Sequence, residues 1–166
     1  MSAVAVAVGL VAAQRLGELA LSARNAKALR RRGAVETGRR QYPLIVALHV
    51  AWLASLALLV PAARRPDQLI IGLYVALQPI RIWAIVSLGP YWTTRVLTVP
   101  EAALVRRGPY RYLRHPIYAV VVAEIALLPL AFGAWRLAAI FSLANLGLLA
   151  WRIAVEDRAL ARRRAA

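Results

Sequence analysis

The most polar stretch of the chain stands directly before an apolar run and carries residue types that bind anions and aromatic bases. It reads RRGPYRYLRHPIY at residues 106–118. Gly108-Pro109 favours a turn, and His115-Pro116 favours a helix that starts at Pro116. His115 would then lie beside unpaired backbone N–H groups at a helix N-terminus, where a carboxylate can bind. The tyrosines offer rings and hydroxyls for a base or a ribose, and the arginines offer donors for anions.

Composition leaves a second interpretation of this segment open. A basic loop held to anionic lipid head groups, with its tyrosines in the interfacial belt, would contain the same residue types. Such a loop would not need a Gly-Pro turn, a His-Pro helix start and spaced tyrosines in this order. The segment therefore favours a binding site, with the arginines also setting membrane topology.

A second group of polar residues lies on one face of the last apolar run. Asn145, Arg152 and Glu156 are spaced i, i+7 and i+11, which places them in one row along a helix. Arg152 and Glu156 could simply neutralise each other at the membrane boundary as an i, i+4 pair. The row reaches too deep for that role alone, so it predicts a polar path from the cytoplasm into a helical bundle.

Other ionisable residues inside apolar runs predict structural pairs, because a charged group in a bilayer is costly and faces a partner or a cavity. Arg15 and Glu18 are three apart and can pair along one helix. Glu124 points away from the start of its own helix, and we expect it to pair with Arg81 or another cation in the bundle. His49 stands alone in its run, and we expect a packed, hydrogen-bonded histidine rather than a ligand.

Composition places the chain among integral membrane proteins. It has 166 residues, of which 61% are hydrophobic, and this is too apolar for a soluble domain of that length. A membrane span needs about 20 apolar residues. The predicted fold class is an all-α integral membrane protein with about five spans, the last two forming a hairpin. The predicted runs are 2–21, 43–63, 68–89, 116–133 and 136–156, and the first could lie in the interface instead.

The formal net charge of +15 is distributed as membrane topology requires. Basic residues concentrate in 24–40, 90–115 and the C-terminal tail, and the positive-inside rule places all three in the cytoplasm. The N-terminus would be outside and the C-terminus inside the inner membrane of a bacterium. This topology explains the charge without nucleic acid as a partner. There is no cysteine and there are only two, widely separated histidines, so no metal site is expected.

The segments GPYRYLRHPIY and WRIAVEDRAL together resemble the isoprenylcysteine carboxyl methyltransferase family, whose wider group includes membrane phospholipid N-methyltransferases. The family pattern is a Gly-Pro-Tyr…Arg-His-Pro-x-Tyr segment, followed one helix pair later by a paired acidic motif. Segments 15–52 and 87–96 are similar to a bacterial branch typified by YpbQ-like proteins, which are often associated with type III polyketide synthases and alkylpyrone O-methylation. The resemblance covers nearly the whole chain.

This resemblance implies one domain over 1–166, with a cofactor-binding core at about 80–160 and a cytoplasmic pocket for S-adenosylmethionine, which leaves as S-adenosylhomocysteine. Consistent with a helical bundle, the chain has no Gly-x-Gly-x-x-Gly turn of the soluble dinucleotide-binding folds. The expected cofactor-binding residues are Gly108, Tyr110, Leu113, Arg114, His115, Pro116, Tyr118 and Glu156, the catalytic residue is Arg152, and the substrate-binding residues are Arg81, Glu124 and Asn145.

Two positions depart from the family pattern. The paired glutamates are Glu156 and Asp157 here, and the shorter second carboxylate reaches less far. Ala119 and Val120 follow the His-Pro-x-Tyr segment, where a glycine is common in the family. Helix packing after Tyr118 is therefore expected to differ from the family pattern.

The expected acceptor is a lipophilic small molecule that enters from the bilayer, with a carboxylate or an enol such as an alkylpyrone at its head. Such groups are anionic near neutral pH and need no strong general base, so an arginine could hold them for in-line transfer. Phospholipid N-methylation is the first alternative. A non-catalytic lipid-binding protein and an NADPH-dependent membrane reductase are alternatives of another class, the latter because sterol reductases share a similar C-terminal architecture.

Overall fold

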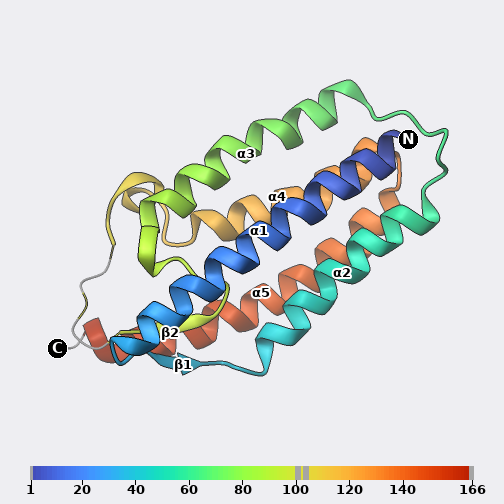
Figure 1. The fold of residues 1–166 in the computed structure, drawn as a ribbon. Helices are drawn as coiled ribbons and strands as arrows, with labels where there is room; N and C mark the ends of the chain where they lie inside the picture. The colour runs from blue at the N-terminus through green and yellow to red at the C-terminus, as the bar shows by residue number, and fades with distance from the viewer. Residues whose placement is uncertain (1, 100–101, 103–104, 165–166) are drawn as a thin grey trace.

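The computed structural model describes residues 2–99, 102 and 105–164, with side chains described as far as residue 159 (Figure 1). Helices dominate these residues, which confirms the predicted all-α architecture. The helices are α1 (Ala3–Arg31), α2 (Gln41–Leu59), α3 (Gln68–Leu88), α4 (Pro116–Ala131) and α5 (Trp135–Arg164), with short 3-10 turns η1 (Gly89–Tyr91) and η2 (Gly108–Arg111). Two strands, β1 (Val35–Thr37) and β2 (Val96–Thr98), complete the described elements.

Four of the described helices, α1, α2, α3 and α5, are long and apolar enough to cross a membrane, and α4 is a shorter apolar helix. Large apolar side chains such as Leu10, Leu58 and Leu143 lie exposed on their outer faces, as lipid contact requires. α1 and α5 continue well beyond the predicted runs, to Arg31 and Arg164. Basic residues end an apolar span, but they do not end a helix, because arginine and lysine are good helix formers.

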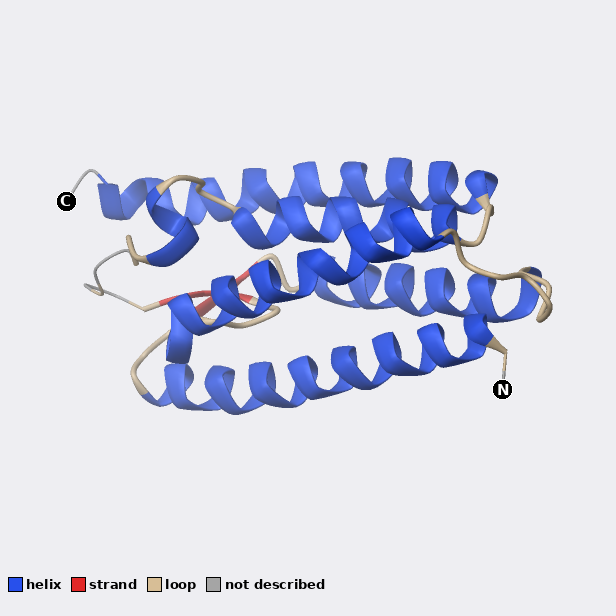
Figure 2. Cartoon of the chain, turned by 90° about the horizontal axis from the view of Figure 1, so that it is seen from above, coloured by secondary structure: helices blue, strands red, loops and turns tan. Residues whose placement is uncertain are grey.

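The helices pack in the order α3, α4, α5, α2 and α1, each against the next (Figure 1). The two strands and the C-terminal end of α5 lie at one end of this bundle, and the N-terminal end of α1 lies at the other (Figure 2). The two ends of the bundle therefore have different characters. The first is rich in loops and charges, and the second is packed with apolar side chains.

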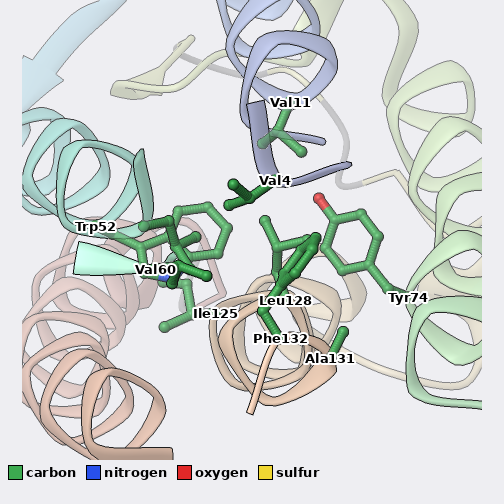
Figure 3. Close-up of a cluster of buried hydrophobic side chains, with 10 residues drawn as sticks. Val4, Val11, Trp52, Val60, Tyr74, Ile125, Leu128, Ala131 and Phe132 are labelled. Carbon is green, nitrogen blue, oxygen red and sulfur yellow. The ribbon is translucent and has the colours of Figure 1, made fainter. Parts of the chain in front are cut away.

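The apolar core occupies the half of the bundle that contains the start of α1 (Figure 3). Val4 of α1, Trp52 and Leu56 of α2, and Ile125 and Leu128 of α4 are almost fully buried there. Between helices in lipid, such close packing, rather than removal from water, supplies the stabilisation.

The loop between α2 and α3 closes this apolar end. The amide of Asp67 donates to the Ala131 carbonyl over 2.7 Å, and Nε of Arg64 donates to the Phe132 carbonyl over 3.1 Å. Asp67 also caps α3, because its carboxylate accepts from the amide of Ile70. Because the core and this loop fill the apolar half of the bundle, the cavities lie in the charged half.

β1 and β2 form a small antiparallel pair that the sequence did not predict. Val35 lies opposite Thr98, and Thr37 lies opposite Val96. Strands of three residues are too short to show the alternating pattern that identifies a strand. The pair holds segment 92–99 beside the C-terminal end of α1, which is the end predicted to be cytoplasmic.

Candidate functional site

Two cavities meet at the charged half of the bundle. The polar cavity has a volume of about 840 Å³ and is lined by residues of 88–99 and 105–118, with Arg152 and Glu156 of α5. The apolar pocket has a volume of about 310 Å³ and is lined by residues of all five helices and of segment 92–94. Five residues line both cavities: Trp92, Thr93, Ile117, Tyr118 and Arg152.

Segment 106–118 forms one wall of the polar cavity. Tyr110, Arg114, His115 and Tyr118 all line it. The ring of His115 stacks on the ring of Tyr118 with centroids 5.0 Å apart and planes 9° apart. His115 precedes Pro116, the first residue of α4, so both rings stand at the helix N-terminus.

Three predicted cofactor residues do not line the polar cavity. Leu113 is 55% exposed, and Pro116 is buried at the start of α4. Gly108 has φ +58° and packs against α3, where a Cβ would collide with Oγ of Ser87 and approach its Cβ to 2.9 Å. Gly108 therefore fixes the turn that carries Tyr110 to the cavity, and the other two lie outside the cavity wall.

The C-terminal half of α5 supplies the opposite wall. The hydroxyl of Tyr118 donates to Oε2 of Glu156 over 2.5 Å, and Nε of Arg152 donates to the same hydroxyl over 2.8 Å. Nη2 of Arg152 donates to the Thr94 carbonyl over 2.9 Å. Within the described residues, Nη1 of Arg152 makes no hydrogen bond, which leaves one charged donor at the junction of the two cavities.

Segment 89–94, which also faces the junction, is held by small polar residues of α1. Oγ of Ser22 accepts from the amide of Thr94 over 2.9 Å. Nδ2 of Asn25 donates to the Trp92 carbonyl over 2.9 Å and to the Gly89 carbonyl over 3.2 Å. Sequence reasoning missed this wall, although Ser22 and Asn25 share a helix face at the end of an apolar run and gave a usable signal.

The polar cavity carries an excess of positive charge. Arg95, Arg106, Arg111, Arg114 and Arg152 line it, against a single carboxylate among the described lining residues, Glu156. Such a lining attracts anionic groups.

Tyr110 presents a neutral hydroxyl to the same cavity. Burial raises the pKa of Tyr110 above its ordinary value, and the charge of Glu156 adds to the shift. The phenol thus stays a hydrogen-bond donor near neutral pH, beside the carboxylate and the arginines.

The apolar pocket opens sideways between α1 and α2. Leu16 of α1 and Val50 of α2 line it and are themselves exposed on the outer surface of the bundle. Asn145 of α5 is buried within its wall, and its Nδ2 has no hydrogen-bond partner among the described residues. A lipophilic molecule could enter from the bilayer and meet this free donor inside.

The predicted substrate residues Arg81 and Glu124 belong to a buried ionic cluster, together with Arg15 and Glu18. Nη1 of Arg81 and Nη2 of Arg15 donate to Oε2 of Glu124 over 2.8 and 2.7 Å, which confirms the predicted Arg81–Glu124 pair. Nε and Nη2 of Arg81 also donate to Oε1 and Oε2 of Glu18, each over 2.6 Å. Arg81 lines the apolar pocket, whereas Glu124 lies behind its wall.

Three arginines surround Glu36 of β1 beside the polar cavity. Arg30 and Arg95 donate to its carboxylate over 2.6 and 2.7 Å, and Arg39 lies 3.6 Å away. Burial opposes ionisation of Glu36, but the hydrogen bonds from Arg95 and Arg30 outweigh it and hold the pKa of this carboxyl below its ordinary value. Arg95 also lies over the Tyr42 ring, 4.0 Å from its centroid, so the contacts join β2 to α2.

Acid is expected to remove the stabilisation that Glu36 contributes. Because its pKa is lower folded than unfolded, the contribution is present above the ordinary pKa of 4.5 and is lost as the pH falls below it. The melting temperatures of the wild type and Glu36→Gln should therefore differ near neutral pH and converge as the pH falls through the lowered pKa of the folded state. A difference that stays constant over this range would contradict the role given to the ionised carboxylate.

Comparison with known proteins gives consistent matches. The model of the isoprenylcysteine carboxyl methyltransferase (ICMT) family matches residues 70–162, which include η2, α4 and most of α5. An uncharacterized protein of Bacillus subtilis, YpbQ, is 38% identical over 157 residues, covering 92% of this chain and 94% of the relative. An uncharacterized protein of Haemophilus influenzae is 27% identical over 157 residues, covering 90% of both chains. No solved structure matches the chain.

Proposed function

The chain belongs to the isoprenylcysteine carboxyl methyltransferase family, and from that premise we propose that it O-methylates a lipophilic acceptor with S-adenosylmethionine. The observation that carries the proposal is the shared wall at Tyr118 and Arg152, where a charged cavity meets an apolar pocket. A transfer from a water-soluble donor to a bilayer-borne acceptor needs two such compartments in contact. Bringing the two reactants together in line is itself a large part of the catalysis.

The polar cavity has the donor set that S-adenosylmethionine requires. His115, Arg114 and the N-terminus of α4 would bind its carboxylate, and Glu156 would accept from its amino group or ribose hydroxyls. Tyr110 and Tyr118 would hold the adenosine. When bound, the cofactor supplies a methyl group already activated on a sulfonium, so the chain need only orient it and exclude water.

The apolar pocket would hold the acceptor with its chain directed toward the bilayer. The free Nη1 of Arg152 would bind the reacting oxygen, and Nδ2 of Asn145 would bind a second oxygen deeper in the pocket. Enols such as alkylpyrones and carboxylates fit this set of donors. The charge distribution supports a bacterial inner-membrane protein with the polar cavity on the cytoplasmic side.

Binding of the product S-adenosylhomocysteine tests the donor site directly. His115→Ala and Glu156→Ala should each weaken binding roughly 10- to 100-fold, because each removes a group that would hydrogen-bond or pair with a charged part of the ligand. Isothermal titration calorimetry of the detergent-solubilised protein measures this. Arg65→Ala is the matched control, since Arg65 is exposed in the α2–α3 loop, and its affinity should equal that of the wild type.

Two outcomes would overturn the proposal. Unchanged affinity in both site variants would remove the donor site from the polar cavity. Binding of NADPH in place of S-adenosylhomocysteine would assign the chain to a reductase. A methyl-transfer assay with an alkylpyrone, a fatty acid and phosphatidylethanolamine then separates O-methylation from phospholipid N-methylation.

A further inference from the structure

His49 lies on α2 in the wall of the apolar pocket, and its ring is held in one tautomer. Its Nδ1 is 2.8 Å from the carbonyl oxygen of Ile45. A carbonyl only accepts, so Nδ1 must carry the hydrogen and the neutral ring keeps its lone pair on Nε2. Within the described part of the chain, no group donates to Nε2. The ring also packs edge-on against Trp52, 6.3 Å between centroids, which fixes its orientation.

The other charged groups around the pocket already have partners. Glu18 accepts from Arg15 and Arg81, and both arginines also reach Glu124. Two cations and two carboxylates thus balance beside His49. These side chains are only 2–13% exposed, so bulk solvent screens their charges little.

The fifth neighbouring charge, Arg152, is balanced in the same way. Its guanidinium and the carboxylate of Glu156 meet on the hydroxyl of Tyr118. Before the sulfonium of the cofactor is in place, an acceptor that arrived as an anion would add an uncompensated charge to this site, which disfavours its entry. A neutral acceptor enters at no such cost, but a neutral hydroxyl is a weak nucleophile and needs a base.

We propose that His49 is that base, and that the acceptor is a neutral enol or phenol carrying an apolar chain. The inference rests on the proposed methyl transfer and refines the expectation that no base is needed. The hydroxyl oxygen bonds to the methyl carbon while the carbon–sulfur bond breaks and its electron pair stays on sulfur. The hydroxyl proton passes to Nε2 of His49, directly or through one water molecule. The positive charge of the sulfonium thus ends on the imidazolium, which later releases its proton to solvent.

A His49→Asn variant separates this role from a structural one. The asparagine amide can still donate to the Ile45 carbonyl, but it has no basic nitrogen. With a long-chain alkylphenol as the probe, whose hydroxyl stays neutral below about pH 9, we expect a rate at pH 7 roughly 10²- to 10⁴-fold lower than the wild type. The wild-type rate should rise with pH in the acid range and level off before neutrality. The variant rate should keep rising with pH, and its affinity for S-adenosylhomocysteine should be unchanged.

A variant that keeps the wild-type rate, or that is slower with the same pH profile, would overturn the role of His49. Equal or faster methylation of the matching fatty acid, unaffected by the substitution, would overturn the neutral acceptor. Failure of the wild type to methylate any probe while it binds S-adenosylhomocysteine counts instead against the proposed O-methylation.

A measurement on the wild type covers the case in which His49→Asn does not fold. Nitrogen-15 NMR of protein labelled at its two histidines reports the tautomer of each ring. We expect His49 to carry its hydrogen on Nδ1, and the Nε2 signal to shift when the alkylphenol is added in the presence of S-adenosylhomocysteine. A hydrogen on Nε2, or an Nε2 signal that does not respond to the alkylphenol, would overturn the inference without reference to activity.

Discussion

An Arg152→Ala protein is expected to transfer methyl groups roughly 10² to 10³ times more slowly than the wild type, the loss typical for removal of one preorganised donor from a reacting centre. Its affinity for S-adenosylhomocysteine should change much less. The reason lies in the geometry of the junction. Nε and Nη2 of Arg152 fasten Tyr118 and Thr94 in place, while Nη1 is the free donor that would bind the acceptor oxygen.

The comparison needs two further variants. Arg152→Lys keeps a positive charge but cannot bind both partners and the acceptor at once, so its rate should lie between the wild type and Arg152→Ala. Arg158→Ala removes an exposed arginine from the same helix, whose one hydrogen bond among the described residues goes to the Ala154 carbonyl, and should have no effect. A parallel loss of rate and of S-adenosylhomocysteine affinity in Arg152→Ala would make Arg152 part of the donor site instead.

The two walls of the polar cavity could be predicted because local rules determine them. Proline at a helix start and glycine in a turn fix where His115 and Tyr110 stand, whatever packs beside them. A fixed helical spacing puts Arg152 and Glu156 on one face. The same local motifs carried the family resemblance, which the family match and the relatives confirm.

Parts of the site that depend on contacts between distant segments could not be predicted. Thr94 is held at the junction by its hydrogen bond to Ser22. Glu36 of β1 is held by its ion pair with Arg95. Neither pairing leaves a periodic signal in the sequence. Leu113 was expected at the cofactor, but a single residue in an irregular turn has no spacing rule to fix the side it faces.

The apolar pocket was the least predictable feature, for a similar reason. Its walls come from five helices, and aliphatic residues on a membrane helix look alike whether they face lipid or a cavity. His49 was correctly expected to be hydrogen-bonded, and the structure gives its partner as the Ile45 carbonyl of the same helix. That His49 also faces a pocket follows only from the packing of α1 and α5 around α2.

Glu124→Ala is expected to lower the free energy of unfolding by about 3–5 kcal/mol, the usual cost of removing one partner from a buried ionic cluster. Its carboxylate is 2% exposed and accepts from Arg15, Arg81 and Gln78. Without it, two buried guanidinium groups share the single carboxylate of Glu18. Thermal unfolding in detergent and denaturant titration would measure the loss.

A double variant distinguishes unpaired charge from lost packing. Arg81→Leu with Glu124→Leu removes one cation and one anion together and leaves Arg15 with Glu18, which are 2.9 Å apart. If unpaired charge dominates, the double variant should be more stable than either single leucine variant, because each single change leaves an uncompensated ion in the bundle. Additive losses would instead mean that the four side chains act mainly by filling space. Arg15, Glu18 and Arg81 line the apolar pocket. The comparison of the single and double variants therefore also shows whether the charge or the volume of the ionic cluster maintains the shape of this pocket.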